Sequence, residues 1–475
     1  MSASEVSSVR TQTQTLDLCL RIGEVLLASG AGAADVTATM QAVARSLGLR
    51  SVDVDITFTS MSMSYQPVAD EPAIVQLRYV KHRTIDYDHL TRVDHLVRSV
   101  LRQDLDLKEA RSELGRITSS GHDRPRWAIT IGWGLMCGGV GLQLGGDLAV
   151  VLIALIAAMT IDRLQLRMSR RRYPAFYQQI AGGGVATMIA LAVAATPLAL
   201  DPSVVVTANI VMLLAGIGFF GALQDALTGF YITAGARLTE AILATAGIIA
   251  GVSGGISLAY AFGVEVPQLD PGSGSLTGVG LTILGSAIAA GSFAYASYAP
   301  RRSLAPIALV AAVAMGITQS VSVPGIGRAW SVALAALFVG LVGYTVGGRL
   351  RVPPLVVVVS AVVPMLPGLS IYRGLTLLAE GGGSTSAGLL AMVTAGSVAM
   401  ALSAGVILGE YVAQPVRREA ARLESRLAGP RLVGPLRTRP DGSQRTRPRR
   451  SRRTRRTRRS RRSRRDRAPH AEHDA

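Results

Sequence analysis

The chain has 475 residues, of which 49% are hydrophobic and 17% are charged, and its formal net charge is +18. Such a charge would suggest a nucleic-acid partner if it were spread evenly. Residues 430–475, however, hold 18 Arg against four acidic residues and carry +14, whereas 1–126 carry −1 and 127–429 carry +5. The charge pattern therefore excludes a uniformly basic nucleic-acid-binding protein, and we expect no specific nucleic-acid partner. It indicates a near-neutral head, an apolar body and a basic tail.

The first 15 residues are polar and lack the basic and apolar segments of a signal peptide. We expect residues 1–15 to be a disordered N-terminus and the head to stay in the cytoplasm. The two cysteines, Cys19 and Cys137, lie far apart and form neither a metal-ligand spacing nor a disulfide framework.

Residues 16–122 are predicted to form a small cytoplasmic α+β domain, which we call the head. Apolar residues recur at helical spacing in some segments and alternate with polar residues, as in strands, in others. The expected helices are Leu16–Leu27, Ala34–Leu47, Leu90–Leu101 and Leu107–Ile117, and the expected strands are Val52–Phe58 and Ile74–Val80.

Two groups of polar residues in the head suggest chemistry. The first matches no zinc-ligand spacing, so we interpret it as a solvated charged face and expect no metal site. It consists of His82, Asp86, Asp88, His89, Asp94 and His95. The second is Ser60, Ser62 and Ser64, for which no activating base can be placed. An enzyme is therefore not expected, although a membrane-anchored hydrolase or sensor acting through the head stays open as an alternative.

Residues 127–410 form a series of apolar stretches, each close to the length of about 20 residues that crosses a bilayer. We expect a polytopic α-helical membrane protein with about ten transmembrane helices, within a range of nine to eleven. The expected spans are 127–146, 147–162, 177–198, 203–223, 238–262, 275–298, 304–322, 329–348, 352–372 and 387–410.

Charge in the connecting loops predicts which side of the membrane they face, because cytoplasmic loops are enriched in Lys and Arg. With the head inside, the predicted cytoplasmic loops hold ten Arg, whereas the opposite loops hold only Arg328 and Arg373. The ten are Arg163, Arg167, Arg170, Arg171, Arg172, Arg237, Arg301, Arg302, Arg349 and Arg351. We therefore expect a multi-pass plasma-membrane protein with both termini in the cytoplasm.

The last region, 411–475, follows the final span and is predicted to be a disordered, Arg-rich cytoplasmic tail. Val416–Leu427 can form an amphipathic helix at the membrane surface, and the repeats of Arg and Pro from Pro430 onward exclude a packed core. Such a segment suits the anionic lipids of the cytoplasmic leaflet. Non-specific nucleic-acid binding and an extension without a selected role stay open.

Ten spans divide into two halves of five, 127–263 and 275–410. An odd number of spans places the second half upside down, which is the inverted-repeat pattern of many secondary transporters. Each half contains helix breakers, hydroxyls and an Arg before its last span, in 224–240 and in 364–374. Interrupted helices of this kind build transporter sites, so we place the candidate site in these two segments.

The same segments carry a resemblance to a known family. Two sets of residues resemble hallmark segments of the threonine/serine exporter (ThrE) family. The first set is Gln224-Asp225, Thr228-Gly229, Thr233-Ala234 and Ala236-Arg237 with Glu240. The second set is the run from Pro364 to Gly374, preceded by Pro353-Pro354-Leu355. The head is similar to that family's N-terminal domain through Ile22-Gly23-Glu24, Ser29-Gly30-Ala31 and the Val52–Phe58 strand. The resemblance covers roughly 16–415 and implies export of small hydroxy amino acids, driven by the proton gradient. Split relatives with the halves on two chains are linked to dicarboxylate export.

Individual residues of these segments have chemically distinct candidate roles. A carboxylate such as Asp225 can carry a proton or pair with an ammonium group, and ionisable residues inside membrane segments are functional by default. The guanidinium groups of Arg237 and Arg373 suit a substrate carboxylate. The alternatives are that Asp225 and Arg237 form a pair that only holds a cytoplasmic loop and that Arg373 is a positive anchor at the membrane interface. For Thr228 a hydrogen bond to its own helix backbone is the favoured interpretation. Glu240 can relay protons or simply reach water. The remaining predicted substrate-binding or coupling residues are Gln224, Thr228, Pro367, Gly368 and Tyr372.

The sequence thus predicts a secondary transporter that exports threonine and serine across the plasma membrane, by alternating access of two inverted halves and by proton antiport. It contains no ATP-binding motif of the type that a pump would need, and no cofactor is expected. Export of dicarboxylates such as succinate is the alternative of the same class. The oligomeric state, including a homo-oligomer, stays open.

Overall fold

The computed structural model describes residues 3–427 apart from a set of short gaps. These gaps are 68–70, 81–82, 195–201, 214–215, 262–275, 322–326, 368–369, 372, 375–376 and 379–383. Residues 1–421 form one compact unit, which contains both the head and the apolar helices. Of the predicted disordered tail 411–475, residues 411–427 are helical, and residues 428–475 lie outside the described residues.

The head is an α+β domain in which four helices pack on a small sheet. Its strands β1 (Val52–Thr57), β2 (Ser60–Tyr65) and β3 (Ile74–Tyr79) are antiparallel in the order β1-β2-β3. Its helices are α1 (Ala3–Ala28), α2 (Ala33–Ser46), α3 (Tyr87–Leu101) and α4 (Leu107–Ser119). Fully buried side chains such as Leu20 and Met40 from the helices and Met61 from the sheet form one hydrophobic core.

Two details of the head differ from the sequence prediction. Helix α1 begins at Ala3, so the prediction of a disordered 1–15 is wrong for most of that segment. The segment lacks Gly and Pro, and Thr13 and Thr15 donate their hydroxyls to carbonyls one turn earlier, so nothing interrupts the helix. The strand β2 fills the gap between the two predicted strands, with Met61 and Met63 alternating into the core.

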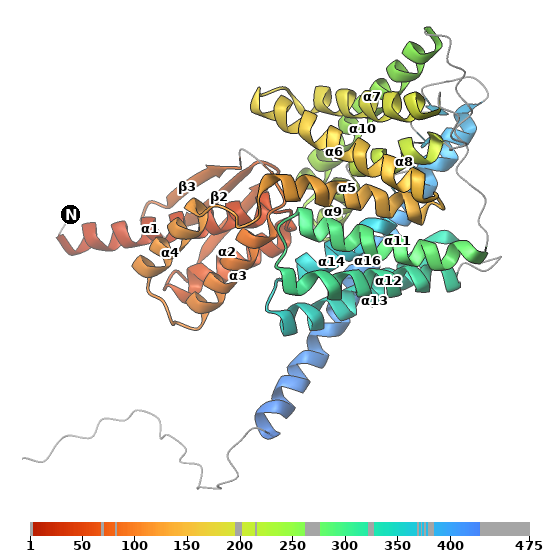
Figure 1. Ribbon diagram of the computed structural model, residues 1–475. Coiled ribbons are helices and arrows are strands. Elements are labelled where there is room, and N and C mark those ends of the chain that lie inside the picture. The colour runs from red at the N-terminus through yellow and green to blue at the C-terminus, as the bar shows by residue number, and fades with distance from the viewer. Residues whose placement is uncertain are drawn as a thin grey trace, which may run out of the picture. The chain divides into compact units, whose positions relative to one another are not determined.

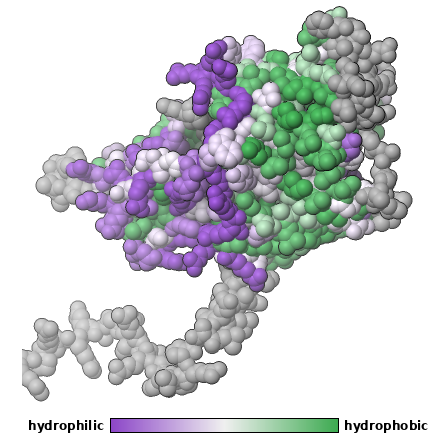
Figure 2. All heavy atoms as spheres, viewed as in Figure 1, coloured by the Kyte–Doolittle hydropathy of each residue, from purple (hydrophilic) through white to green (hydrophobic). Residues whose placement is uncertain are grey.

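The apolar region is a helical bundle joined directly to the head (Figure 1). Its helices are α5 (Arg126–Gln143), α6 (Leu148–Arg170), α7 (Ala175–Ala194), α8 (Pro202–Leu213), α9 (Gly216–Leu227), α10 (Tyr231–Ala261), α11 (Leu276–Ala296), α12 (Arg301–Val321), α13 (Arg328–Leu350), α14 (Pro354–Val362), the 3₁₀ turn η1 (Val363–Met365) and α16 (Thr385–Leu427). Hydrophobic residues dominate the visible surface of the bundle and hydrophilic residues that of the head (Figure 2).

Within the described residues, seven helices are long and apolar enough to cross a membrane, or eight if one bent pair is counted as a single span. The bent pair is α8 and α9, which meet at 47°. Of the ten predicted spans, 127–146 corresponds to the shorter α5 and 352–372 to the short α14 with η1. The chain is therefore a polytopic helical membrane protein, and the count of ten and the inverted repeat stay predictions.

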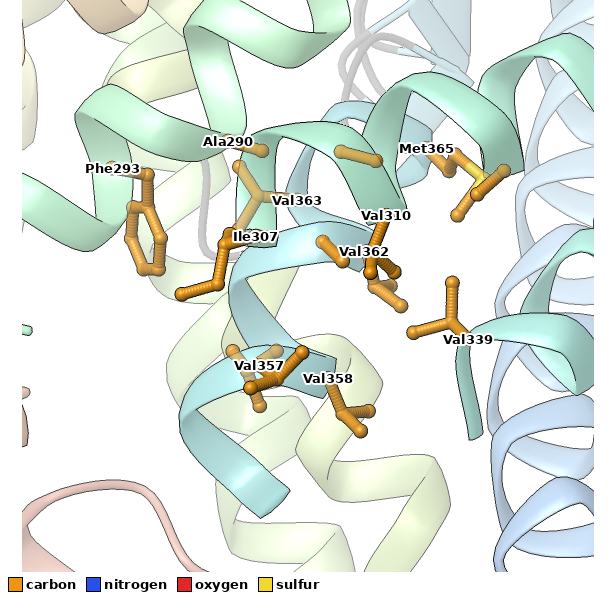
Figure 3. Packing of buried hydrophobic residues seen from close by; sticks show 14 of the residues in the cluster. Ala290, Phe293, Ile307, Val310, Val339, Val357, Val358, Val362, Val363 and Met365 are labelled. Carbon is orange, nitrogen blue, oxygen red and sulfur yellow. The ribbon is translucent and has the colours of Figure 1, made fainter. Parts of the chain in front are cut away.

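The middle of the bundle is built from small and β-branched side chains. Val357, Val358 and Val362 of α14 are buried among residues of α11, α12 and α13, such as Phe293 and Ile307 (Figure 3). Small residues allow helices in a bilayer to approach closely. A Cβ added to Gly285 of α11 would lie 2.6 Å from the carbonyl oxygen of Gly139 in α5, so glycine is required at that contact.

Candidate functional site

The first predicted segment forms a tight helical turn between α9 and α10. Gly229 has a φ of +92°, a conformation that glycine adopts without strain. The backbone N–H of Phe230 donates to the carbonyl oxygen of Asp225 at 2.8 Å and closes the turn. The chain therefore reverses at this point, and the first turns of α10 lie beside the last turn of α9.

This reversal places Asp225 against Arg237 in a buried ion pair. Nη1 of Arg237 lies 3.0 Å from Oδ2 of Asp225, and the two residues are 5% and 0% exposed. Gly221 lies one turn before Asp225, and a Cβ at that position would come within 2.8 Å of Nη1 of Arg237. The sequence Gly221 to Asp225 thus provides both the space and the counter-charge that Arg237 needs.

The ion pair also holds the head. Oδ1 of Asp225 accepts a hydrogen bond from the backbone N–H of Ala33 at 2.9 Å, and Nη2 of Arg237 donates to the carbonyl oxygen of Ala31 at 3.2 Å. Ala33 is the first residue of α2, whose N-cap Gly32 offers no side chain to its orphan N–H groups. A carboxylate at a helix N-terminus is favourable, so Asp225 caps α2 from the membrane domain.

Thr233 connects the same turn to the sheet of the head. Its hydroxyl donates to the carbonyl oxygen of Ile56 and accepts from the backbone N–H of Phe58, both at 3.2 Å. Phe58 has a φ of +40°, an uncommon conformation for a residue with a side chain. The tip of the β1-β2 hairpin is therefore held against α10 by a buried hydroxyl.

Arg83 brings a second guanidinium group from the head to this junction. Its Cζ lies 4.1 Å from the centre of the Phe58 ring, and its Nη2 donates to the carbonyl oxygen of Phe58. Burial, followed by the positive charge of Arg237, lowers the pKa of Arg83 to about 10. No sequence motif indicates Arg83, because it precedes α3 in a connector without a motif.

Two cavities lie at the junction between the head and the membrane helices. The first, which we call the arginine cavity, has a volume of about 180 Å³ and is lined by Arg83, Arg237 and Glu240, among others. The second, the carboxylate cavity, has a volume of about 270 Å³ and is lined by Asp35, Asp94 and Glu410, among others. Both cavities share Phe220, Gln224 and Val359 in their walls.

The carboxylate cavity joins acidic groups from the head and from α16. Asp35 keeps solvent contact, but the protein around it and the nearby carboxylate of Asp225 raise its pKa above the ordinary value. Burial raises the pKa of Asp94, although the positive charge of Arg98 lowers it. Nη2 of Arg98 lies 2.7 Å from Oδ2 of Asp94. The head therefore contributes acidic groups with raised proton affinity to this cavity.

The structure divides the remaining predicted residues of the first segment by environment. Gln224 lines both cavities. Thr228 is exposed and its hydroxyl bonds the carbonyl oxygens of Gln224 and Asp225, which is an ordinary structural role for a helical Thr. Glu240 is exposed but reaches the wall of the arginine cavity.

The second predicted segment is interrupted, as its two prolines indicate. Helix α14 gives way to the 3₁₀ turn η1, and Nε2 of Gln143 donates to the carbonyl oxygen of Pro364 at 3.0 Å. Pro367 is buried and Arg373 is exposed, whereas the predicted residues Gly368 and Tyr372 lie outside the described residues.

The two segments lie toward different ends of helix α5. Gln143 is the last residue of α5, whereas Arg124, just before its first residue, donates to the carbonyl oxygen of Tyr295 at 2.7 Å near the head. The backbone N–H of Tyr87 in the head donates to the carbonyl oxygen of Ser297 in the same region. An α-helix of 18 residues is about 27 Å long, so Pro364 is far from the head side of the bundle.

A second ion pair, of which only the carboxylate is buried, joins residues that no sequence motif indicates. Nη2 of Arg126 lies 2.5 Å from Oδ1 of Asp162, and the hydroxyl of Thr130 donates to Oδ2 of Asp162 at 2.7 Å. Asp162 is 5% exposed. The available signal was an acidic residue at the end of a predicted span. Both carboxylate oxygens have partners, so this pair joins α5 to α6.

The polar face of the head is more clustered than predicted. Asp86 and His89 meet His122, and one candidate ligand atom from each lies within 4.8 Å of the others. The predicted solvated face did not include His122, which reaches the other two because the segment after α4 folds back over the start of α3, and all three side chains keep partial solvent contact. Each has a structural role: Asp86 caps α3, Nε2 of His89 lies 3.3 Å from the carbonyl oxygen of Ser120, and His122 stacks on Tyr298.

Comparison with known proteins supplies the family. A model described as "Putative threonine/serine exporter" matches residues 17–259, and one described as "Threonine/Serine exporter, ThrE" matches residues 282–412. The chain is 35% identical over 444 residues to "Probable threonine/serine exporter" of Mycobacterium tuberculosis, which covers 91% of this chain and 84% of that protein. It is 32% identical over 409 residues to "Threonine/serine exporter" of Corynebacterium glutamicum, covering 85% and 83%.

A more distant relative matches only half of the chain. It is "Probable succinate transporter subunit YjjP" of Escherichia coli, which is 25% identical over 236 residues, or 50% of this chain and 91% of that protein. No solved structure matches the chain.

Proposed function

The chain belongs to the threonine/serine exporter family, and on that premise we propose that it exports threonine and serine across the bacterial plasma membrane. The observation that carries the proposal is the match of family models to both parts of the chain, together with relatives of that name over most of its length. The junction of head and bundle adds two cavities lined by charged groups at the Asp225–Arg237 turn.

We propose that transport is secondary and exchanges the amino acid for protons by alternating access. Asp225 is the proposed coupling residue, because its carboxylate is buried inside the apolar region with one cationic partner, Arg237. Protonation of Asp225 would weaken both that ion pair and the cap on α2. The interrupted segment near Pro364 and Arg373 would act at the opposite end of the pathway, with Arg373 as a second site for the substrate carboxylate.

The head and both termini are proposed to lie in the cytoplasm. Arg237, in the second turn of α10, and Arg351, directly after α13, contact the head. The first donates to the carbonyl oxygen of Ala31, and the carbonyl oxygen of the second lies 2.9 Å from Nε2 of His95. Nη2 of Arg302 bonds the same carbonyl oxygen of Arg351. Three loops that the charge rule assigns to the cytoplasm are therefore found on the side of the head.

We propose that the remaining partners are protons and lipids. The segment 430–475 carries 18 Arg against four acidic residues, and each basic residue near an anionic surface contributes roughly 1 kcal/mol to lipid association. Association of the tail with anionic lipid is expected, a specific nucleic-acid partner is not, and assembly as a homo-oligomer stays a proposal. The protein is proposed to act as a transporter without a cofactor and not as an enzyme.

Efflux from loaded cells tests this function. Cells that express the chain are loaded with threonine-containing dipeptides or with succinate, and efflux is followed with and without an uncoupler. The proposal expects faster threonine efflux than in vector-only cells, and expects the uncoupler to abolish the difference. Faster efflux of succinate alone would favour the dicarboxylate alternative.

A second arm of the same assay tests the head-centred alternative. Expression of residues 121–475 removes the head. Threonine efflux at the full-chain rate from this truncation would contradict a transport role for the head and would leave a separate hydrolase or sensor role for it.

A further inference from the structure

The arginine cavity contains two guanidinium groups that keep an unused donor. Nε of Arg83 and Nε of Arg237 are both buried without a hydrogen-bond partner, and both residues line the cavity. Arg237 is only 5% exposed. Leaving a buried charged donor unpaired is costly, so such a group indicates an acceptor that binds there.

Other nitrogens of these two guanidinium groups contact the protein. Arg237 uses Nη1 for Asp225 and Nη2 for the carbonyl oxygen of Ala31. Arg83 uses Nη2 for the carbonyl oxygen of Phe58 and lies over its ring. Both guanidinium groups are therefore held in position by protein contacts while the Nε–H of each stays without a partner. An acceptor in the cavity would meet a preorganised pair of donors.

We infer that the arginine cavity binds the carboxylate of a small transported solute, with Arg83 of the head and Arg237 of α10 as its two donors. The identity of that solute rests on the proposed function. Guanidinium groups pair with carboxylates through short charge-assisted hydrogen bonds. The head thus supplies half of the binding site, and Arg83 is the binding residue that the sequence motifs do not contain.

The neighbouring carboxylate cavity adds a preference between two kinds of solute. It shares Phe220, Gln224 and Val359 with the arginine cavity and presents Asp35, Asp94 and Glu410. An ammonium group is attracted to these carboxylates, whereas a second carboxylate is repelled by them. The pair of cavities therefore favours a zwitterionic amino acid over a dicarboxylate.

Binding to the purified full-length chain tests the inference. Radiolabelled threonine is displaced by unlabelled threonine, by threonine amide, which lacks the carboxylate, and by succinate. For Arg83→Gln we expect threonine to bind about 10- to 100-fold more weakly, while the weaker binding of the amide is unchanged. Arg83→Lys should lose part of this affinity, because it keeps the charge but not the planar fork. Arg102→Gln, an exposed Arg of the head, is the matched control.

Substitutions that neutralise acidic residues of the two cavities test the same site without changing its arginines. Glu240→Gln removes a negative charge from the wall of the arginine cavity, and we expect threonine affinity to stay or to rise. Glu410→Gln should weaken threonine but strengthen succinate. These variants leave Arg83 and its contacts with Phe58 intact, so they keep the test valid if Arg83→Gln is unstable.

The possible outcomes separate the inference from the proposed function. If Arg83→Gln binds threonine like the parent protein, or loses threonine and the amide equally, the carboxylate assignment is overturned while threonine export stands. If the parent binds succinate and not threonine, and Arg83→Gln weakens succinate, the carboxylate site stands and the proposed substrate is wrong.

Discussion

The carboxylate of Asp225 caps a helix of another domain: its Oδ1 accepts the backbone N–H of Ala33 at 2.9 Å, across 192 positions of sequence. The residue that normally caps such a helix precedes it in the chain, and here that residue is Gly32. One carboxylate thus serves the ion pair with Arg237 and the start of α2. Any event that neutralises Asp225 acts on the membrane helices and on the head together.

The first prediction concerns this shared carboxylate. Asp225→Asn keeps an oxygen for the N–H of Ala33 but leaves Arg237 as a buried charge without a counter-charge. Breaking a buried ion pair in this way costs about 3–5 kcal/mol. We expect a clearly lower thermal midpoint of the purified protein and the loss of uncoupler-sensitive threonine efflux.

Neutralising the partner as well separates stability from coupling. The double variant Asp225→Asn with Arg237→Gln removes the unpaired charge, so we expect part of the thermal stability to return while proton-driven efflux stays absent. Normal counterflow and normal proton-driven efflux in a well-expressed Asp225→Asn protein would exclude Asp225 as the coupling residue.

The second prediction concerns the space that Arg237 occupies. The Cβ of Gly221→Ala would lie 2.8 Å from Nη1 of Arg237, so the guanidinium must shift from the position in which it pairs with Asp225. We expect lower thermal stability and weaker threonine binding. Gly235→Ala is the matched control, because its Cβ meets nothing within 4 Å. On helix propensity alone the control should be neutral or more stable by up to about 1 kcal/mol. Equal effects of both alanines would refute the role given to Gly221.

The third prediction concerns pH. The pKa of Asp35 lies above its ordinary value of 3.8 because the surrounding protein partly desolvates this solvent-contacting side chain and because Asp225 is nearby. The folded chain therefore holds this proton more tightly than the unfolded chain. The resulting stability is fully present below the ordinary pKa and is lost as the pH rises through the folded-state pKa. Asp35→Asn imitates the protonated form, so its thermal midpoint should exceed that of the parent increasingly toward neutral pH.

A comparison on the sheet controls for the general effect of removing a carboxylate. Asp53→Asn changes an exposed acidic side chain of β1, and its midpoint should follow that of the parent across the same pH range. A constant offset between Asp35→Asn and the parent at every pH would contradict the proposed titration.

The sequence predicted well those features that depend on local pattern. The alternation in Val52–Thr57 and the spacing in Leu107–Ile117 identify a strand and a helix that the structure contains. The motif spacing also singled out Asp225 and Arg237, which form an ion pair. These features are visible in a single segment, because periodicity and turn residues act over a few positions.

The remainder depends on which distant segments meet, and no local pattern contains that information. Arg83 became part of the candidate site only because Phe58 and the end of α9 surround it. His122 joined Asp86 through the return of the chain after α4. Asp162 found its partner in another helix, at Arg126. In each case no motif surrounds the residue in the sequence, and its contacts come from segments that are distant in the sequence.

The last prediction concerns the hydroxyl that joins the head to α10. Thr233→Val is nearly isosteric but removes the acceptor for the N–H of Phe58 and the donor to the carbonyl oxygen of Ile56. Groups left unsatisfied at a buried position cost about 1–3 kcal/mol each. We expect faster proteolysis at the junction between head and bundle, and weaker threonine binding, because Arg83 is positioned by Phe58. Thr239→Val is the matched control, since that exposed hydroxyl bonds only the carbonyl oxygen of Gly235 in its own helix. If Thr233→Val and Thr239→Val leave proteolysis and binding equally unaffected, the head does not depend on this contact to complete the site.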